Sequence, residues 1–275
     1  FLAIDAKDAG WGLLHGDKIE VLKETSSGVA GKHRQGGQSA KRFQKLREME
    51  IGYYFTRVAN TTREYFIDIY PIKGLIVSGP GPTKEEFVNQ NYLEYRLQNM
   101  IIGTIDASYA GSEGIREAFT RSSELLSDFR MVEEKQLVDK LFKQINSHSG
   151  LGVYGLADII DYLKNNVVDM IIVTDNIELN RIEVKCNKCS SITDKIVEQR
   201  ILIKTKTELQ NSSCSSCKSR DIVVTDQDLV DYLDLLAAKT GTSLEVISGV
   251  AESGSMLASL GKIGAILRYN PNFAN

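Results

Sequence analysis

Apolar and polar positions in the first half of the chain alternate in a way that predicts strands followed by helices. Short apolar runs separated by Asp, Gly and Pro residues predict β-strands at residues 1–4, 12–14, 19–22, 74–78 and 101–105. Residues 15–18 predict a hairpin turn between two of these strands. Helical periodicity follows at residues 40–58, resumes at Lys84, and extends from Glu113 to about Ser147. This alternation indicates an α/β domain.

The second half of the chain repeats the alternation. It predicts helices at residues 156–164 and 226–238, and strands at residues 167–173, 244–247 and 263–267. Because the stretch Glu133-Glu134-Lys135 is highly charged, we place a domain boundary near residue 130. The sequence therefore predicts two α/β domains, at residues 1–130 and 131–275. A segment of different character, at about 180–222, is inserted into the second domain.

The helix predicted after residue 39 carries a stripe of aromatic and aliphatic residues. Phe43, Leu46, Tyr53 or Tyr54, and Val58 recur near helical spacing, and Ser39 is a suitable N-cap. We interpret the stripe as the face that packs on the core, which makes the helix a rigid mount. The polar stretch before it, residues 24–38, is predicted to be a loop of a length that is often functional.

That loop ends in the tripeptide Gly36-Gly37-Gln38. Two adjacent glycines open positive φ angles and let the backbone approach another molecule closely. The Gln38 carboxamide donates and accepts hydrogen bonds, but it is neither a nucleophile nor a general base at neutral pH. The tripeptide can therefore position a water or a carbonyl, and it is not a self-contained active site. Taken alone, the glycine pair also fits an ordinary flexible loop.

Basic residues surround the tripeptide, although the chain of 275 residues carries a formal net charge of −3. No acidic residue lies between positions 32 and 47. This local excess of positive charge suits contact with phosphates. An ordinary solvated helix face is the alternative. The candidate RNA-binding residues are Arg34, Lys41, Arg42, Lys45 and Arg47.

The four cysteines form two Cys-x-x-Cys pairs in the inserted segment, Cys186 with Cys189 and Cys214 with Cys217. Two such pairs supply the four thiolates of a tetrahedral zinc site. Four protein ligands leave no position for water, so the predicted Zn²⁺ is structural, in a zinc ribbon that depends on the metal for folding. Two redox pairs or a disulfide framework are the alternatives. Acidic residues offset the lysines of the ribbon, so we predict no nucleic-acid contact for it.

Composition places the chain among globular proteins, with 42% apolar and 25% charged residues. No apolar run approaches the roughly 18 residues that span a bilayer, and the N-terminus lacks a signal-peptide pattern. We therefore expect a soluble, cytoplasmic protein without membrane contact. Because Phe1 already lies in a predicted strand, we also expect the chain to be a fragment of a longer protein.

Three segments together resemble one protein family. They are residues 36–47, which begin Gly-Gly-Gln-Ser-Ala, residues 106–111 (Asp-Ala-Ser-Tyr-Ala-Gly) and residues 261–269 (Gly-Lys-Ile-Gly-Ala-Ile-Leu-Arg-Tyr). They resemble the class I peptide chain release factors (subunit 1) of archaea and eukaryotes, and the resemblance covers essentially the whole chain. It implies an RNase H-like mixed-sheet middle domain and a ribosomal-protein-like α/β/α sandwich as C-terminal domain, with the zinc minidomain of the archaeal variety.

The resemblance implies a translation termination factor. Gly36, Gly37 and Gln38 match the family's catalytic tripeptide, which enters the ribosomal peptidyl-transferase centre and triggers hydrolysis of the peptidyl-tRNA ester. Such a protein acts only together with the ribosome and is not a free-standing enzyme. Its implied partners are the large-subunit RNA and peptidyl-tRNA, a translational GTPase bound through the C-terminal domain, and an ABC-type recycling ATPase. Stop codons are read by an N-terminal domain through an Asn-Ile-Lys-Ser loop, a sequence that does not occur here.

Two other hypotheses stay open. A Pelota-type ribosome-rescue adaptor shares the two-domain layout and binds a similar GTPase without hydrolysing the ester, but it lacks Gly-Gly-Gln. The other is a zinc-ribbon RNA-binding protein, or a nuclease with an RNase H-like sheet and Asp5 and Asp106 as metal ligands. Turn or capping roles are the simpler interpretation of these two aspartates.

Overall fold

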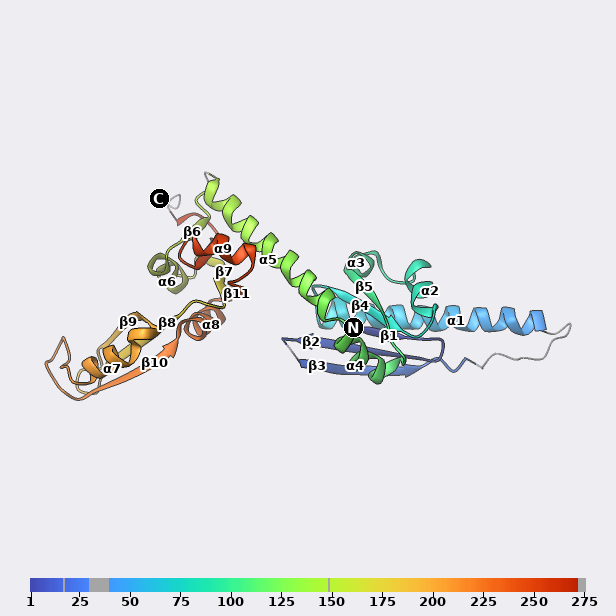
Figure 1. Cartoon of the computed structure of the whole chain (residues 1–275), viewed down its shortest axis with the longest axis horizontal. Coiled ribbons are helices and arrows are strands. Elements are labelled where there is room, and N and C mark those ends of the chain that lie inside the picture. The colour runs from blue at the N-terminus through green and yellow to red at the C-terminus, as the bar shows by residue number, and fades with distance from the viewer. Residues whose placement is uncertain (17, 30–39, 148, 272–275) are drawn as a thin grey trace. The chain divides into compact units, whose positions relative to one another are not determined.

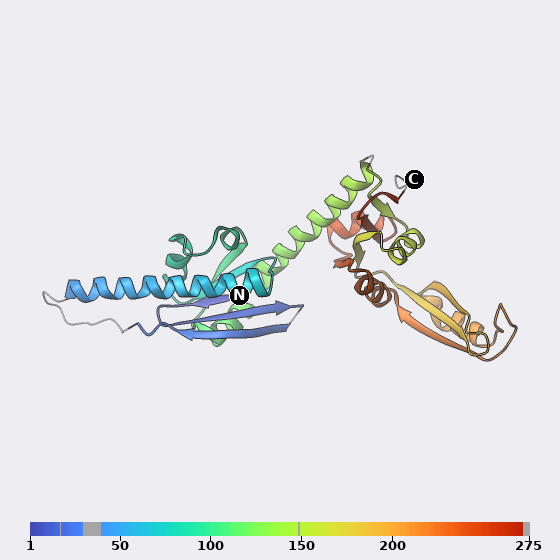
Figure 2. The same ribbon diagram turned by 180° about the vertical axis from the view of Figure 1, so that it is seen from behind.

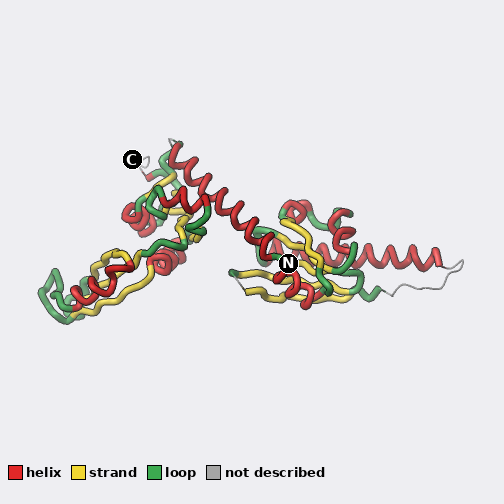
Figure 3. Tube along the Cα trace, viewed as in Figure 1, coloured by secondary structure: helices red, strands yellow, loops and turns green. Residues whose placement is uncertain are grey.

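The computed structural model describes residues 1–16, 18–29, 40–147 and 149–271. The chain divides into two compact units, residues 1–130 and residues 131–275. Each unit combines helices with β-sheet, as Figures 1 and 3 show, and the predicted α/β fold class is confirmed. None of the described helices combines the length and the apolar character needed to traverse a lipid bilayer.

Unit 1 is built on a mixed five-stranded sheet. In spatial order its strands are β3 (Lys18–Ser26), β2 (Asp8–His15), β1 (Leu2–Ile4), β4 (Leu75–Gly79) and β5 (Ile101–Asp106). β1, β4 and β5 are parallel, and β2 and β3 form the predicted antiparallel hairpin. The loop predicted to begin at residue 24 starts later, because β2 still pairs with β3 as far as Ser26.

Helices cover both faces of this sheet. They are α1 (Ala40–Arg63), the π-helix Glu64–Ile69, α2 (Thr83–Asn89), α3 (Tyr95–Asn99), α4 (Gly111–Arg121) and the start of α5 (Ser123–Asn146). Because successive side chains of a strand point to opposite faces, Leu2 and Ile4 pack with α1, α2 and α3, whereas Phe1 and Ala3 pack with α4. The inner strands β1 and β4 are therefore buried on both sides, which explains their continuous apolar runs.

The apolar stripe of α1 faces the core only in the C-terminal half of the helix. Tyr54 and Val58 are 2% and 0% exposed. Phe43 and Leu46 are 53% and 51% exposed, so the interpretation of the stripe as core-facing is wrong for these two residues. Of the two alternatives Tyr53 and Tyr54, Tyr54 is the one in the core, and Tyr53 is 71% exposed. The physical reason is that α1 reaches beyond the strands (Figures 1 and 2), so its first turns have no sheet to cover.

This division of α1 predicts different stability effects for two truncations. Val58→Ala is expected to lower the free energy of unfolding by about 2 kcal/mol, because it empties space in a packed core. Leu46→Ala is expected to lower it by less than about 0.5 kcal/mol, because its side chain is already in water. Urea denaturation of both variants measures the difference. Equal losses would show that Leu46 is buried in solution.

Unit 2 has a four-stranded sheet between two helical layers. Its strands, in spatial order, are β11 (Ser243–Ile247), β7 (Val168–Thr174), β12 (Ile263–Leu267) and β6 (Gly152–Tyr154). β11 is parallel to β7, and β12 is antiparallel to both its neighbours. The helices α6 (Leu156–Lys164) and α8 (Leu229–Thr240) pack on one face, and α5 and α9 (Glu252–Ala258) pack on the other.

The elements predicted for unit 2 are present, with one difference in their bounds. The helix predicted at 226–238 begins only at Leu229, because the residues before it complete strand β10 (Ile222–Asp228). Asp228 Oδ1 caps the helix by accepting the N–H of Val230 at 2.8 Å. The charged stretch Glu133-Glu134-Lys135 lies inside α5, within the range from Glu113 to about Ser147 that is predicted to be helical. Charged residues are equally suited to the solvent face of a helix.

Residues 179–228, here called the minidomain, form a third sheet within unit 2. Its order is β10-β8-β9, with β8 at Leu179–Cys186 and β9 at Ile192–Glu198. Helix α7 (Leu202–Gln210), which the sequence analysis did not predict, covers one face of this sheet. The buried side chains that join them are Ile182, Val197 and Leu202.

Candidate metal centre and the Gly-Gly-Gln segment

Four cysteine thiols meet in the minidomain. Cys186 ends β8, and Cys214 and Cys217 lie between α7 and β10. The four Sγ atoms lie within 4.8 Å of one another, and the Cys186–Cys217 and Cys189–Cys214 pairs are each 3.6 Å apart. Zinc–sulfur bonds of about 2.3 Å in a tetrahedron place sulfur atoms about 3.8 Å apart. The four free thiols therefore fit one tetrahedral metal ion.

The two Cys-x-x-Cys turns have the same backbone geometry. The residues that follow the second cysteine of each pair, Ser190 and Lys218, have left-handed φ angles of 58° and 59°. The N–H of Ser190 donates to the carbonyl of Cys186, and the N–H of Lys218 donates to that of Cys214, each at 2.9 Å. Two matched turns thus present two thiols each to a common centre, as the spacing predicts.

Ser191 contacts this cluster, and no spacing rule identifies it in the sequence. Its Oγ lies 3.2 Å from the Sγ atoms of both Cys189 and Cys214. The hydrogen bond with Ser191 is the main cause that lowers the pKa of Cys214 to about 5. The N–H of Ser219 favours the Cys217 thiolate, yet burial and the neighbouring thiols raise the pKa of Cys217 to about 12. Four thiols this close become four thiolates only around a cation.

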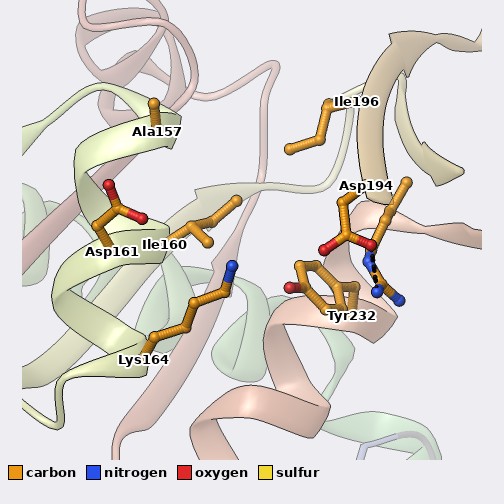
Figure 4. A pocket seen from close by; sticks show the side chains of 8 residues that line it. Ala157, Ile160, Asp161, Lys164, Asp194, Ile196 and Tyr232 are labelled. Carbon is orange, nitrogen blue, oxygen red and sulfur yellow. Dashed lines mark hydrogen bonds and ion pairs between the residues drawn. The ribbon is translucent and has the colours of Figure 1, made fainter. Parts of the chain in front are cut away.

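A pocket of about 300 Å³ lies between the minidomain and α6 (Figure 4). Arg181 closes one side of it, with its Cζ 4.3 Å from the centroid of the Tyr232 ring and an Nη2 atom 2.5 Å from the Asp194 carboxylate. Asp161 and Lys164 line the opposite wall. The pocket lining contains two acidic and two basic side chains, Asp161, Asp194, Lys164 and Arg181. The stacked Arg181 joins the minidomain to α8.

The tripeptide Gly36-Gly37-Gln38 lies outside the described residues, and so do Arg34 and the side chain of Lys41. The described chain stops at residue 29 and resumes at the start of α1. Arg42 and Lys45 are exposed on the first turns of α1, and Arg47 is half-buried there.

The described residues that follow β3, Ser27 to Val29, form a corner that hydrogen bonds hold in place. The N–H of Ser27 donates to the carbonyl of Lys7, and the N–H of Val29 donates to Ser27 Oγ at 3.0 Å. Lys7 is itself part of a turn in which Asp5 Oδ1 accepts the N–H groups of Lys7 and Asp8, each at 2.7 Å. Asp5 therefore has the turn role that is the simpler interpretation of this residue.

Residues 106–111, the second of the resembling segments, form a corner after β5. Asp106 Oδ1 accepts a hydrogen bond from Lys84 Nζ at 2.6 Å, and Lys84 is only 2% exposed. This bond holds the pKa of Asp106 below its usual value. The N–H and hydroxyl of Ser108 donate to Glu117 at 2.7 and 3.0 Å. Among the described residues, only the cysteines group three or more potential ligands closely enough to share an ion, so neither aspartate belongs to a metal site there.

The Lys84–Asp106 pair predicts an acid-sensitive contribution to stability. Asp106→Asn is expected to lower the free energy of unfolding at pH 7, because the buried Lys84 ammonium then keeps only the Glu85 carboxylate as a charged partner. Since folding lowers the pKa of Asp106, the contribution is present above the usual pKa of 3.8 and lost as pH falls through the folded value. Denaturation at pH 7 and pH 3 measures both effects. If the free energy of unfolding falls equally between pH 7 and pH 3 in the parent and the variant, the Lys84–Asp106 pair adds no acid sensitivity.

The fold and the site define a two-part α/β protein with a four-cysteine minidomain. A family model described as eRF1 domain 2 matches residues 1–128, and one described as eRF1 domain 3 matches residues 131–271. The chain belongs to the eRF1 family, of which it contains domains 2 and 3.

The chain is similar to archaeal proteins named peptide chain release factor subunit 1. It is 33% identical over 273 residues to the protein of Methanocaldococcus jannaschii and 34% identical over 272 residues to that of Pyrococcus abyssi. Both alignments cover 98% of this chain but 65% of the relative, so the chain spans less than two thirds of the length of these proteins.

Two solved structures resemble the fold. The C-terminal domain of a peptide chain release factor from Methanosarcina mazei is 26% identical, with a TM-score of 0.50 over 60% of this chain and 99% of that one. A chain from a model of ribosome-bound archaeal Pelota and ABCE1 is 21% identical, with a TM-score of 0.58 over 98% of this chain and 60% of that one. At that identity the second likeness shows the fold alone.

Proposed function

We propose that this protein is the middle and C-terminal part of a translation termination factor, which triggers hydrolysis of the peptidyl-tRNA ester in the peptidyl-transferase centre. One observation carries the proposal. The eRF1 domain models match both units of a chain that also holds Gly36-Gly37-Gln38 between β3 and α1. Stop-codon recognition is then the task of the family's first domain.

In this mechanism the tripeptide completes a catalytic centre made of ribosomal RNA. Gly36 and Gly37 let the backbone fit among nucleotides. When water attacks the ester carbonyl, the Gln38 backbone N–H donates to the developing oxyanion, and the Gln38 carboxamide orients the water. The bond from the acyl carbon to the tRNA oxygen breaks, the peptide keeps the hydroxyl of water, and the tRNA oxygen takes a proton. The protein acts only with the ribosome.

The basic residues around the tripeptide are proposed to contact phosphates of the large-subunit RNA. The exposure of Arg42 and Lys45 at the end of α1 next to the segment supports this role. Such contacts position the protein and take no part in the reaction. The full set is Arg34, Lys41, Arg42, Lys45 and Arg47.

The four-cysteine site is proposed to hold a structural Zn²⁺. Soft thiolate ligands in a tetrahedron are the donor set that zinc prefers. With Cys186, Cys189, Cys214 and Cys217 as its ligands, the ion has no position left for a substrate. Its role is to hold the two turns together.

We assign residues 1–130 to the middle domain and residues 131–275 to the C-terminal domain, with the zinc minidomain at about 180–222 inside the latter. The C-terminal domain is proposed to bind a translational GTPase and an ABC-type recycling ATPase in the cytoplasm. The support is the likeness of fold to Pelota in a structure described as ribosome-bound with ABCE1. The chain has no phosphate-binding G-x-x-x-x-G-K-S/T motif, so the partners hydrolyse the nucleotide.

A Pelota-type rescue adaptor is the second candidate function. The likeness of fold, with a TM-score of 0.58, favours it. The presence of Gly36-Gly37-Gln38 argues against it, because a non-hydrolytic adaptor has no use for the tripeptide. The nuclease hypothesis has lost its basis, since Asp5 caps a turn and Asp106 pairs with Lys84.

Peptide release on archaeal ribosomes distinguishes these functions. The chain is joined to domain 1 of the Methanocaldococcus jannaschii factor and added to ribosomes that hold labelled peptidyl-tRNA at a stop codon. A termination factor releases the peptide, whereas an adaptor binds and leaves the ester intact. Domain 1 alone and ribosomes paused at a sense codon are the controls.

A further inference from the structure

Helix α1 contacts the described chain that precedes residues 30–39 and also begins directly after them. It begins at Ala40. Arg57 of the same helix reaches the backbone at the end of β3. Its Nη2 donates to the carbonyl of Ser26 at 2.7 Å and lies 3.5 Å from that of Ser27. Ala40 and Arg57 are separated by a rise of about 25 Å along α1.

Arg57 is itself held in place. Its Cζ lies 5.7 Å from the centroid of the Tyr54 ring, and Tyr54 belongs to the core of unit 1. The Ser26–Ser27 corner is bound from a second side, because Ser26 Oγ donates to the carbonyl of Lys7 at 3.3 Å and the N–H of Ser27 donates to the same oxygen. The corner is thus held between the β1–β2 turn and α1.

We propose that Arg57 is a positioning residue for peptide release, which fixes the root of the Gly-Gly-Gln segment on α1. This inference rests on the proposed termination function. The tripeptide must meet a defined ester carbonyl. If the chain at Ser26 and Ser27 is not held, a smaller fraction of conformations places the tripeptide correctly, and release is slower. The guanidinium suits this task, since its Nη2 binds the Ser26 carbonyl while its planar group lies 5.7 Å from the centroid of the Tyr54 ring, whereas a lysine ammonium is a single point charge.

Hydrogen exchange tests the contact without the ribosome. Arg57→Ala is expected to speed exchange of the Ser27 and Val29 amides at least about tenfold, because the corner opens more often. Arg63→Ala is the matched control, since Arg63 lies on the same helix and pairs with Asp68 and Glu94, each at 3.4 Å. It should leave those two amides unchanged. Unchanged exchange in Arg57→Ala overturns the inference whatever the protein does on the ribosome.

Peptide release tests the consequence, in the chain joined to domain 1. At saturating protein, Arg57→Ala is expected to slow single-turnover release about tenfold, and Arg57→Lys about threefold. The melting temperature, the half-saturating concentration and its salt dependence stay as in the parent. A normal rate at saturation, or weaker binding with a shallower salt dependence, overturns the inference, because the latter marks a phosphate contact. If Gly37→Ala also releases peptide at the normal rate, the proposed termination function is wrong. Faster amide exchange in Arg57→Ala would still establish the contact between Arg57 and the corner.

Discussion

Gly37→Ala is expected to reduce peptide release by more than about 100-fold, the scale of losing one oxyanion donor. The substitution adds a methyl group where the backbone must lie against ribosomal nucleotides. It also removes the positive φ angles that glycine adopts freely. Single-turnover release of labelled peptide measures the rate, and the half-saturating concentration should stay within about twofold because the phosphate contacts are intact.

Gly28→Ala is the matched control for this substitution. Gly28 has a φ of +71°, and a Cβ added there would meet nothing within 4 Å. The control therefore imposes backbone strain near the same segment without adding a contact, and release should fall by no more than about threefold. Normal release by Gly37→Ala would contradict the termination function. Equal losses in both variants would place the effect in the backbone of the segment and not in the tripeptide.

The sequence predicts those parts of the fold in which burial is continuous. Strands β4 and β12 are buried along their whole length, so they appear in the sequence as uninterrupted runs. Helix α7 is not predictable in this way, because only Leu202 and Thr205 of its nine residues are buried. Periodicity also cannot tell how far a helix reaches past its sheet, which is why Leu46 and Val58 have opposite environments on one helix.

The functional residues differ in the same way, because some of their contacts are local in sequence and others are not. The cysteine pairs are predictable, because each turn brings two ligands together within four residues of chain. Contacts between segments far apart in sequence leave no local pattern. Arg57 and Ser26 are 31 positions apart, and nothing near Arg57 distinguishes it from an exposed helical arginine. Lys84 likewise appears in the sequence as a solvent-exposed residue at the start of a helix, and its ion pair with Asp106, 22 positions away, leaves no local pattern.

Cys214→Ser is expected to release the metal and unfold the minidomain while the sandwich of unit 2 stays folded. The cluster that joins α7 to the minidomain sheet contains three buried side chains, Ile182, Val197 and Leu202, which contribute about 1.5–3 kcal/mol each. A structural zinc contributes about 10–16 kcal/mol. The metal therefore stabilises the minidomain more than this cluster does, and bound zinc per chain should fall from about one to less than about 0.1. Elemental analysis measures the metal, and amide exchange should increase within β8, β9 and α7 but not within β7 and β12.

Ser215→Ala is the control, because Ser215 is exposed and lies between the two cysteines of the same turn. It should keep one zinc per chain and the exchange pattern of the parent. A chelator added to the parent protein should reproduce the Cys214→Ser pattern, because both remove the same ion. Protection of β8 and β9 that survives without metal would contradict the structural role. Two disulfides in the metal-free protein would instead support the redox alternative.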